Sequence, residues 1–170
     1  MATPLNTSAG SFDALYRESA RDLYAYVRTL LGDDAAAEDV TALAFERAYR
    51  RRASFDARRG SQRGWLFGIA RNAALDELRR RSRAAPLVGD LPDERAPAPE
   101  EEADLAVRRT TVRAALAALS PRDRELVALK FHGGLTNAEL AAVLGTSESN
   151  AGTRLHRAVA KLREACNAPA

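Results

Sequence analysis

A proline-rich, acidic segment near the middle of the chain places the strongest limit on how these residues can fold. Residues 84–104, AAPLVGDLPDERAPAPEEEAD, contain four prolines and seven acidic residues against a single arginine. Such a segment buries too little apolar surface to offset the entropy lost on folding. We therefore predict that residues 84–104 are a flexible, extended linker. It joins one domain at residues 11–83 to a second at residues 105–168, and residues 1–10 are a disordered tail.

Apolar side chains on both sides of this linker recur at the three- and four-residue spacing of amphipathic helices. Ser11 is a candidate N-cap and Gly32 a candidate stop for the first helix, while Ser120 and Pro121 start a helix beyond the linker. No stretch alternates as a strand does over a useful length. The predicted fold class is all-α, with two small helical domains. The predicted helices include residues 11–31, 34–52, 64–83 and 105–119, and residues 53–63 form a loop.

The end of the chain carries a pattern typical of DNA-binding proteins. In residues 135–164, Thr136 and Glu139 form a T-x-x-E capping box, Gly145 permits a sharp turn, and Ser147 caps a second helix. Two short helices joined in this way predict a helix-turn-helix, whose second helix enters the major groove. A plain helical hairpin explains the same spacing, and the surrounding basic residues favour DNA. The candidate contacts are Lys130, Ser149, Asn150, Thr153, Arg154 and Arg157.

A second candidate for nucleic-acid binding lies in residues 64–83, GWLFGIARNAALDELRRRSR. On a helix, Trp65, Gly68, Asn72 and Arg79 fall close to one stripe. An aromatic ring, an amide and guanidinium groups suit an unpaired base and its phosphates. The alternative is that the tryptophan anchors a core, the amide is an ordinary surface group and the arginines form a solvated helix end. The candidate contacts are Trp65, Arg71, Asn72, Arg79 and Arg80.

Charge and composition narrow the classes of function. Acidic and basic blocks alternate along the chain, although the net charge is only +3, and two basic blocks suit two contacts with a polyanion. Cys166 is the only cysteine, which excludes a disulfide within one chain. No apolar run approaches the length of a membrane helix. We expect a soluble cytoplasmic protein that is not an enzyme, with no catalytic residues, no metal and no cofactor.

Three segments, in this order around the acidic linker, together resemble the bacterial sigma-70 family of RNA polymerase sigma factors, in its extracytoplasmic-function (ECF) group. AEDVTALAFERAYRR (37–51) resembles region 2.2 of that family. SFDARRGSQRGWLFGIARNAALDELRRR (54–81) resembles regions 2.3 and 2.4, and residues 119–163 resemble region 4. The resemblance covers nearly the whole chain, from about residue 11 to residue 165.

The resemblance implies a factor that binds the RNA polymerase core and directs it to promoters. Its first domain would recognise and melt the −10 element, with Asn72 at a position that helps capture a flipped base, and its second would recognise the −35 element. The helix at residues 37–51 would dock on the β′ coiled coil of polymerase, and region 4 would contact the β flap. An anti-sigma factor is a further implied partner. The candidate polymerase contacts are Glu38, Asp39, Phe45 and Arg47.

The chain departs from the family pattern at two places. Ala42-Leu43 stands where a Gln-Glu pair is usual, inside the polymerase-docking helix. Ala151-Gly152 stands where Val-Lys or Val-Arg is common in the DNA-recognition helix, so the −35 sequence is not predicted. The alternative function is a stand-alone helix-turn-helix regulator that binds an operator without polymerase.

Overall fold

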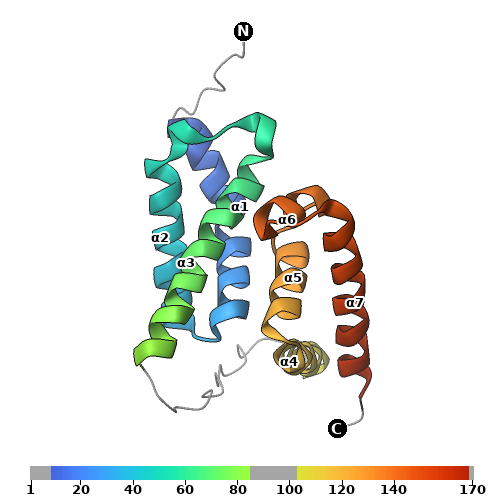
Figure 1. Ribbon diagram of the computed structural model, residues 1–170. Helices are drawn as coiled ribbons and strands as arrows, with labels where there is room; N and C mark the ends of the chain where they lie inside the picture. The colour runs from blue at the N-terminus through green and yellow to red at the C-terminus, as the bar shows by residue number, and fades with distance from the viewer. Residues whose placement is uncertain (1–8, 85–102, 169–170) are drawn as a thin grey trace.

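The computed structural model describes residues 9–84 and 103–168, and all of the regular elements in these two ranges are helices (Figure 1). This agrees with the predicted all-α class. Residues 1–8 of the predicted tail lie outside the described residues. Residues 9 and 10, also predicted as tail, lie in the first helix. Most of the predicted linker, residues 85–102, also lies outside them.

The first domain packs three long helices around an apolar core (Figure 1). All three helices contribute side chains to this core, and the largest of these include Leu23, Tyr26 and Phe67. Gly32 adopts the left-handed conformation (φ 66°) and ends the first helix, as predicted. The next helix starts at once, because the Asp33 carboxylate accepts a hydrogen bond from the backbone N–H of Ala36 at 3.0 Å. The helices are α1 (Ala9–Leu31), α2 (Asp34–Arg50) and α3 (Gln62–Ala84).

The boundaries of these helices differ from the predicted ones by about one turn or less. Helix α1 begins at Ala9, so Ser11 lies inside it and is not its N-cap. Helix α3 begins before residue 64, because the Ser61 hydroxyl accepts a hydrogen bond from the N–H of Gly64 at 3.0 Å. The predicted loop contains two short 3-10 helices, η1 (Arg52–Ser54) and η2 (Ala57–Arg59). These turns bring Phe55 back against the start of α3.

The second domain begins with α4 (Ala103–Ala118) and α5 (Pro121–Phe131) and ends with α6 (Asn137–Leu144) and α7 (Glu148–Asn167). The predicted caps are present. The Ser120 hydroxyl accepts from the N–H of Asp123 at 3.2 Å, and Thr136 and Glu139 form a complete capping box at the start of α6. Gly145 has φ 65°, which allows α6 to turn sharply into α7. The predicted helix-turn-helix is therefore formed by α6 and α7.

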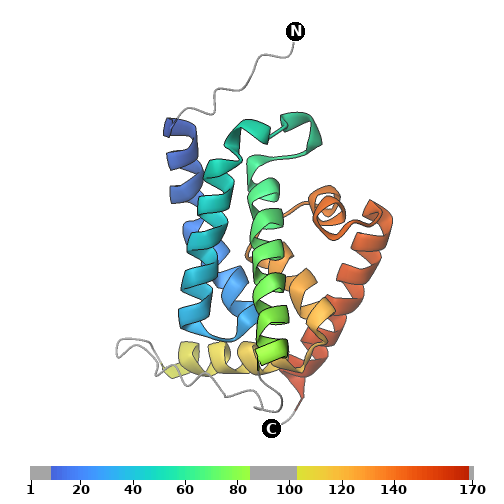
Figure 2. The ribbon, with the colours of Figure 1, turned by 60° about the vertical axis from the view of Figure 1, so that its left-hand side comes forward.

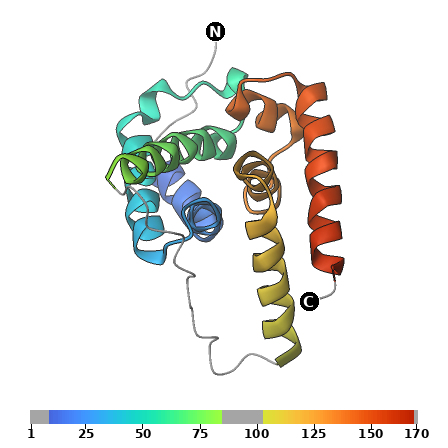
Figure 3. The same cartoon turned by 60° about the horizontal axis from the view of Figure 1, so that its bottom comes forward.

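The two domains pack directly against each other, which the sequence pattern did not predict. Helix α5 lies beside α1, and helix α6 lies beside α3 (Figures 1 and 3). Figure 2 shows α3 at the front, between the rest of the first domain and the second domain. The helix carrying Asn72 is therefore one of the two first-domain helices on which the second domain packs.

Candidate nucleic-acid interface

The middle of α3 presents an amide to solvent beside a partly covered indole. Asn72 is exposed, whereas its neighbours Ala73 and Ala74 are buried in the core of the first domain. Trp65 is half-buried about two turns before it, and its ring packs against Phe55 with the centroids 5.5 Å apart. The structure thus places Trp65 as an anchor of the preceding loop, and the residue stays partly exposed.

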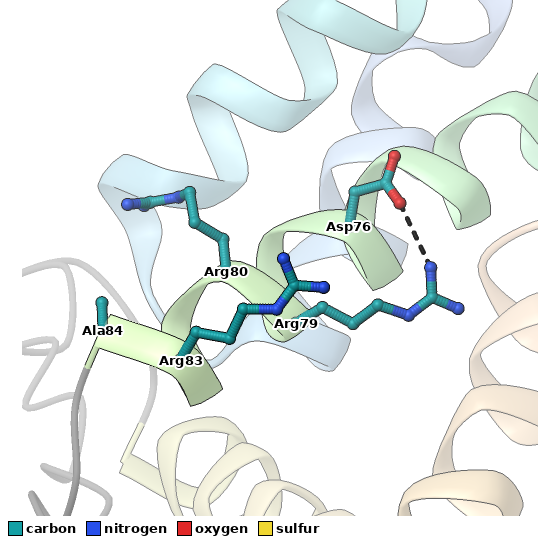
Figure 4. A pocket seen from close by; sticks show the side chains of 5 residues that line it. All are labelled: Asp76, Arg79, Arg80, Arg83 and Ala84. Carbon is teal, nitrogen blue, oxygen red and sulfur yellow. Dashed lines mark hydrogen bonds and ion pairs between the residues drawn. The ribbon is translucent and has the colours of Figure 1, made fainter.

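The C-terminal end of α3 is a cluster of exposed arginines. Arg79, Arg80 and Arg83 line an open hollow together with Asp76 and Ala84 (Figure 4). The Nη1 atom of Arg79 lies 3.3 Å from the Asp76 carboxylate, yet its side chain stays 65% exposed. Arg80 is 70% exposed although it pairs with Glu77. These guanidinium groups are positioned by local carboxylates and remain accessible to a phosphate.

The Glu77 carboxylate orients two arginines at this end of α3, Arg80 and Arg81. Arg80 donates two hydrogen bonds of 2.8 Å to this carboxylate, and Arg81 donates a third of 2.9 Å. The bonds from Arg80 first, and then those from Arg81, hold the pKa of Glu77 at about 2, below its ordinary value of 4.5. Arg81 also contacts Asp33 and the carbonyl of Leu31, both at 3.3 Å. Arg81 therefore fastens α3 to the turn between α1 and α2.

Arg71 does not face solvent as the sequence prediction required. Its Nε atom donates a hydrogen bond to the carboxylate of Glu125 in α5, and its side chain is 24% exposed. Its charge is thus engaged by the second domain in this conformation. Among the predicted contacts on α3, the structure leaves Asn72, Arg79 and Arg80 accessible, and it adds Arg83, which belongs to the same basic run.

The first three turns of α7 form the second candidate surface. Four of the predicted contacts are exposed there, and Arg154 is half-buried. The Asn150 amide nitrogen donates to the Thr146 hydroxyl at 2.6 Å, which orients the side chain at the start of the helix. The exposed contacts are Ser149, Asn150, Thr153 and Arg157.

Lys130 has a different position from the one expected for a DNA contact. Its ammonium group donates a hydrogen bond to the carbonyl of Leu135 at 2.9 Å and is half-buried. It closes the connection between α5 and α6, and no sequence pattern indicates this contact because the partner is a backbone atom. Of the two unusual residues in α7, Ala151 is fully buried, and Gly152 lies near the Asn137 side chain.

The predicted polymerase-docking helix is α2, and it divides into exposed and buried positions. Glu38 and Asp39 are exposed, as is Ala42. Phe45 is buried, because its ring packs against those of Phe12 and Tyr16, at centroid distances of 6.4 and 4.7 Å. The structure therefore corrects the expectation for Phe45, which belongs to the core. Arg47 is about one-third exposed and lies 3.7 Å from the carboxylate of Asp76 in α3.

Residues 9–84 and 103–168 contain neither a metal-binding cluster nor a membrane-spanning helix. Within these ranges, no group of three or more His, Cys, Asp or Glu side chains is arranged to hold a metal ion. No helix in the same ranges is both long and apolar enough to span a membrane.

Comparisons with known proteins match both domains to one family. Residues 15–84 match the model of Sigma-70 region 2, and residues 109–162 match that of Sigma-70, region 4. The ECF RNA polymerase sigma factor SigL of Mycobacterium tuberculosis is 36% identical over 152 residues, which is 88% of this chain and 85% of SigL. The ECF RNA polymerase sigma factor BldN of Streptomyces coelicolor is 33% identical over 157 residues, which is 91% of this chain and 60% of BldN.

Solved structures of sigma factors share the fold. The sigma factor RpoE, solved with the anti-sigma factor NepR from Bartonella quintana, has a TM-score of 0.77 at 23% identity. That match covers 95% of this chain and all of RpoE as solved. CnrH, solved with the cytosolic domain of CnrY, has a TM-score of 0.69 at 24% identity and covers 96% of this chain and 92% of CnrH. With both regions matched in order, the chain belongs to the sigma-70 family of RNA polymerase sigma factors, in its ECF group.

Proposed function

We propose that this sigma factor binds the promoter −10 element through the exposed face of α3 and the −35 element through the start of α7. The observation that carries the proposal is the position of Asn72. This amide is exposed on α3, on the same helix as the open arginine cluster at its C-terminal end. A surface that binds an unpaired base needs both an amide and arginines, because the base and its phosphate are bound by different groups.

The chemistry of each group on α3 follows from its surroundings. An amide both donates and accepts hydrogen bonds, so Asn72 matches the Watson–Crick edge of a base lifted out of the duplex. The accessible part of Trp65 offers a surface against which a base can stack, at about 1–3 kcal/mol per base. Arg79, Arg80 and Arg83 neutralise phosphates of the same strand, which makes this contact dependent on salt.

The helix-turn-helix supplies the duplex contact. Because the N-terminal turns of a recognition helix meet the base edges, Ser149, Asn150 and Thr153 are the side chains nearest the bases. Asn150 suits adenine, which offers a donor and an acceptor in the major groove, and Arg157 about two turns later suits phosphate or guanine. Arg154 joins this surface from a half-buried position.

The docking surface for the polymerase core is the exposed side of α2. Glu38 and Asp39 provide negative charge there, and Ala42 lies on the next turn. Since Phe45 is buried, it supports this surface from inside. Arg47 orients α2 against α3 through Asp76. We further propose that an anti-sigma factor regulates the chain in the cytoplasm, by analogy with the complexes in which RpoE and CnrH were solved.

The chain acts by binding and contributes no catalytic group of its own. Promoter DNA bound to polymerase exists in a duplex state and a melted state. The sigma factor shifts the equilibrium between them because it binds the melted state more tightly. Capture of the unpaired strand by α3 therefore shifts the equilibrium of the polymerase-bound promoter from duplex towards melted DNA.

The role of Asn72 is tested by promoter opening. Core polymerase with the wild-type chain or with Asn72→Ala is mixed with a promoter that the wild type transcribes, and unpaired thymines are detected with permanganate. We expect Asn72→Ala to reduce the open fraction about tenfold or more, because one amide pair to a base is worth about 1–3 kcal/mol. Asn167→Ala removes an exposed amide at the far end of α7 and should have no effect. Unchanged opening with Asn72→Ala on all promoters would contradict the capture role.

A further inference from the structure

One carboxylate lies on the face of α3 that we assign to promoter DNA. Asp76 follows Asn72 by four residues and precedes Arg79 by three, so the three side chains lie along one stripe of the helix. Arg83 continues this stripe one turn later. The Asp76 side chain is 58% exposed, and Figure 4 shows it at the hollow lined by the arginines. A nucleic acid that binds this face therefore meets one negative charge among the positive ones.

This carboxylate works against phosphate binding, because like charges repel at short distance. The second acidic residue of α3, Glu77, avoids this conflict. Its side chain is only 15% exposed, and its oxygens accept hydrogen bonds from Arg80 and Arg81. Asp76 instead remains at the surface. An ionised carboxylate only accepts hydrogen bonds, so the group on DNA that Asp76 suits is a donor and not a phosphate.

The contacts of Asp76 within the chain are long. The Nη1 atom of Arg79 lies 3.3 Å from Oδ1, and the Nη1 atom of Arg47 in α2 lies 3.7 Å from Oδ2. Hydrogen bonds between charged N–H and carboxylate groups usually measure about 2.7–2.9 Å. A carboxylate also offers about four lone-pair sites. Asp76 therefore keeps the capacity to accept a shorter bond, and the 65% exposed Arg79 is accessible to a phosphate at the same time.

The exocyclic amines of the bases are the donors that promoter DNA offers to a carboxylate. Cytosine suits it best, because its N4 amine is a donor at the major-groove edge and carboxylate side chains accept from it. Adenine places the acceptor N7 beside its amine, which an amide matches better than a carboxylate. Guanine and thymine offer acceptors and no donor at this edge, so they repel a carboxylate.

We propose that Asp76 determines part of the −10 specificity by accepting a hydrogen bond from N4 of a cytosine. Four residues of helix place Asp76 about 6 Å along the axis from Asn72, so the two side chains reach different bases. The cytosine is therefore a neighbour of the base that Asn72 captures. This inference rests on the proposed function, because it takes α3 as the −10 contact. When Arg79 binds a phosphate, it leaves Asp76 to the base.

Base preference tests this assignment. A promoter that the wild-type chain transcribes is changed to each of the four bases, one position at a time, through the −10 element and its flanks. Transcripts are counted with core polymerase and either the wild-type chain or Asp76→Ala. We expect the wild type to favour cytosine over guanine and thymine about fivefold or more at one position. Asp76→Ala should abolish the preference there and leave those at other positions intact.

A second variant separates base recognition from the positioning of arginines. Asp76→Asn keeps the size of the side chain and adds a donor, so guanine and thymine should become acceptable at the same position. If Asp76 only orients Arg47 and Arg79, both variants should lower transcription by one factor for all four bases. Such a uniform loss would overturn the proposal, and so would a dependence on Asp76 at a base other than cytosine.

Two further variants complete the experiment. Asp104→Asn removes the same charge at an exposed position of α4 and should leave every base preference unchanged. Asn72→Ala, taken through the same promoters, tests the proposed function separately. If Asn72→Ala removes a base preference and the Asp76 variants remove none, the proposed function stands and the role of Asp76 is refuted. If neither residue affects a base preference, both are contradicted.

Discussion

Glu77 illustrates how a single carboxylate sets the geometry of the arginine cluster. Because hydrogen bonds from Arg80 and Arg81 lower its pKa to about 2 in the folded chain, the charged form is favoured by folding. Its contribution to stability is fully present above its ordinary value of 4.5. That contribution is lost progressively as the pH falls from 4.5 to about 2, where the folded-state carboxylate takes up its proton.

We therefore expect Glu77→Gln to lower the free energy of unfolding at neutral pH, and this difference from wild type to shrink as the pH falls from 4.5 towards 2. Urea unfolding at a series of pH values measures it. Other carboxylates titrate in the same range, and subtracting the two curves removes their effect. A difference that does not depend on pH would show that the arginines do not favour the ionised carboxylate.

Tyr26 is a fully buried residue of α1, near Glu125 of the second domain. Its hydroxyl has no hydrogen-bond partner among the described residues, and its pKa is raised, first by burial and then by the nearby Glu125. Burying an unpaired hydroxyl costs about 1–3 kcal/mol. We expect Tyr26→Phe to leave the stability of the chain unchanged or to raise it, as measured by urea unfolding. A loss of more than about 1 kcal/mol would show that the hydroxyl is satisfied.

At the scale of elements, the sequence predicted what is decided locally. The Thr136 capping box, the Gly145 turn and the Ser120 cap depend on side chains within a few residues, so their patterns were sufficient. The boundaries of α3 were missed because its cap is the hydroxyl of Ser61, which lies in a segment with loop composition. Phe45 was assigned to polymerase binding from the family resemblance, although its spacing from Ala37, Val40, Ala44 and Ala48 places it on the buried face of α2.

The two glycines of the helix-turn-helix should respond oppositely to alanine. Gly152 lies in the interior of α7, where an added Cβ would meet the Asn137 amide at an ordinary contact distance of 3.4 Å. We expect Gly152→Ala to stabilise the chain by about 0.5–1 kcal/mol through helix propensity. Gly145 has φ 65°, and Gly145→Ala should destabilise it by about 1–2 kcal/mol. Thermal unfolding of both variants measures this, and a stabilising Gly145→Ala would contradict the assigned turn.

At the scale of the whole molecule, contacts between distant segments decided what the sequence could not. The motifs correctly placed Asn72, Arg79 and Arg80 at accessible positions of α3. These positions depend only on the periodicity of a single helix. The partner of Arg71 lies 54 residues further along the chain, in α5, and no periodic pattern marks it. The packing of the second domain on α3 likewise depends on Gly64, Glu125 and Glu139, which carry no shared motif.

The most direct test of the account is run-off transcription. The purified chain is added to bacterial core polymerase with a pool of genomic promoter fragments, and new transcripts are sequenced. The account predicts specific transcripts that share upstream −35 and −10 motifs and that are absent with core polymerase alone. The absence of new transcripts, together with tight duplex binding by the chain alone, would contradict it and identify a stand-alone regulator.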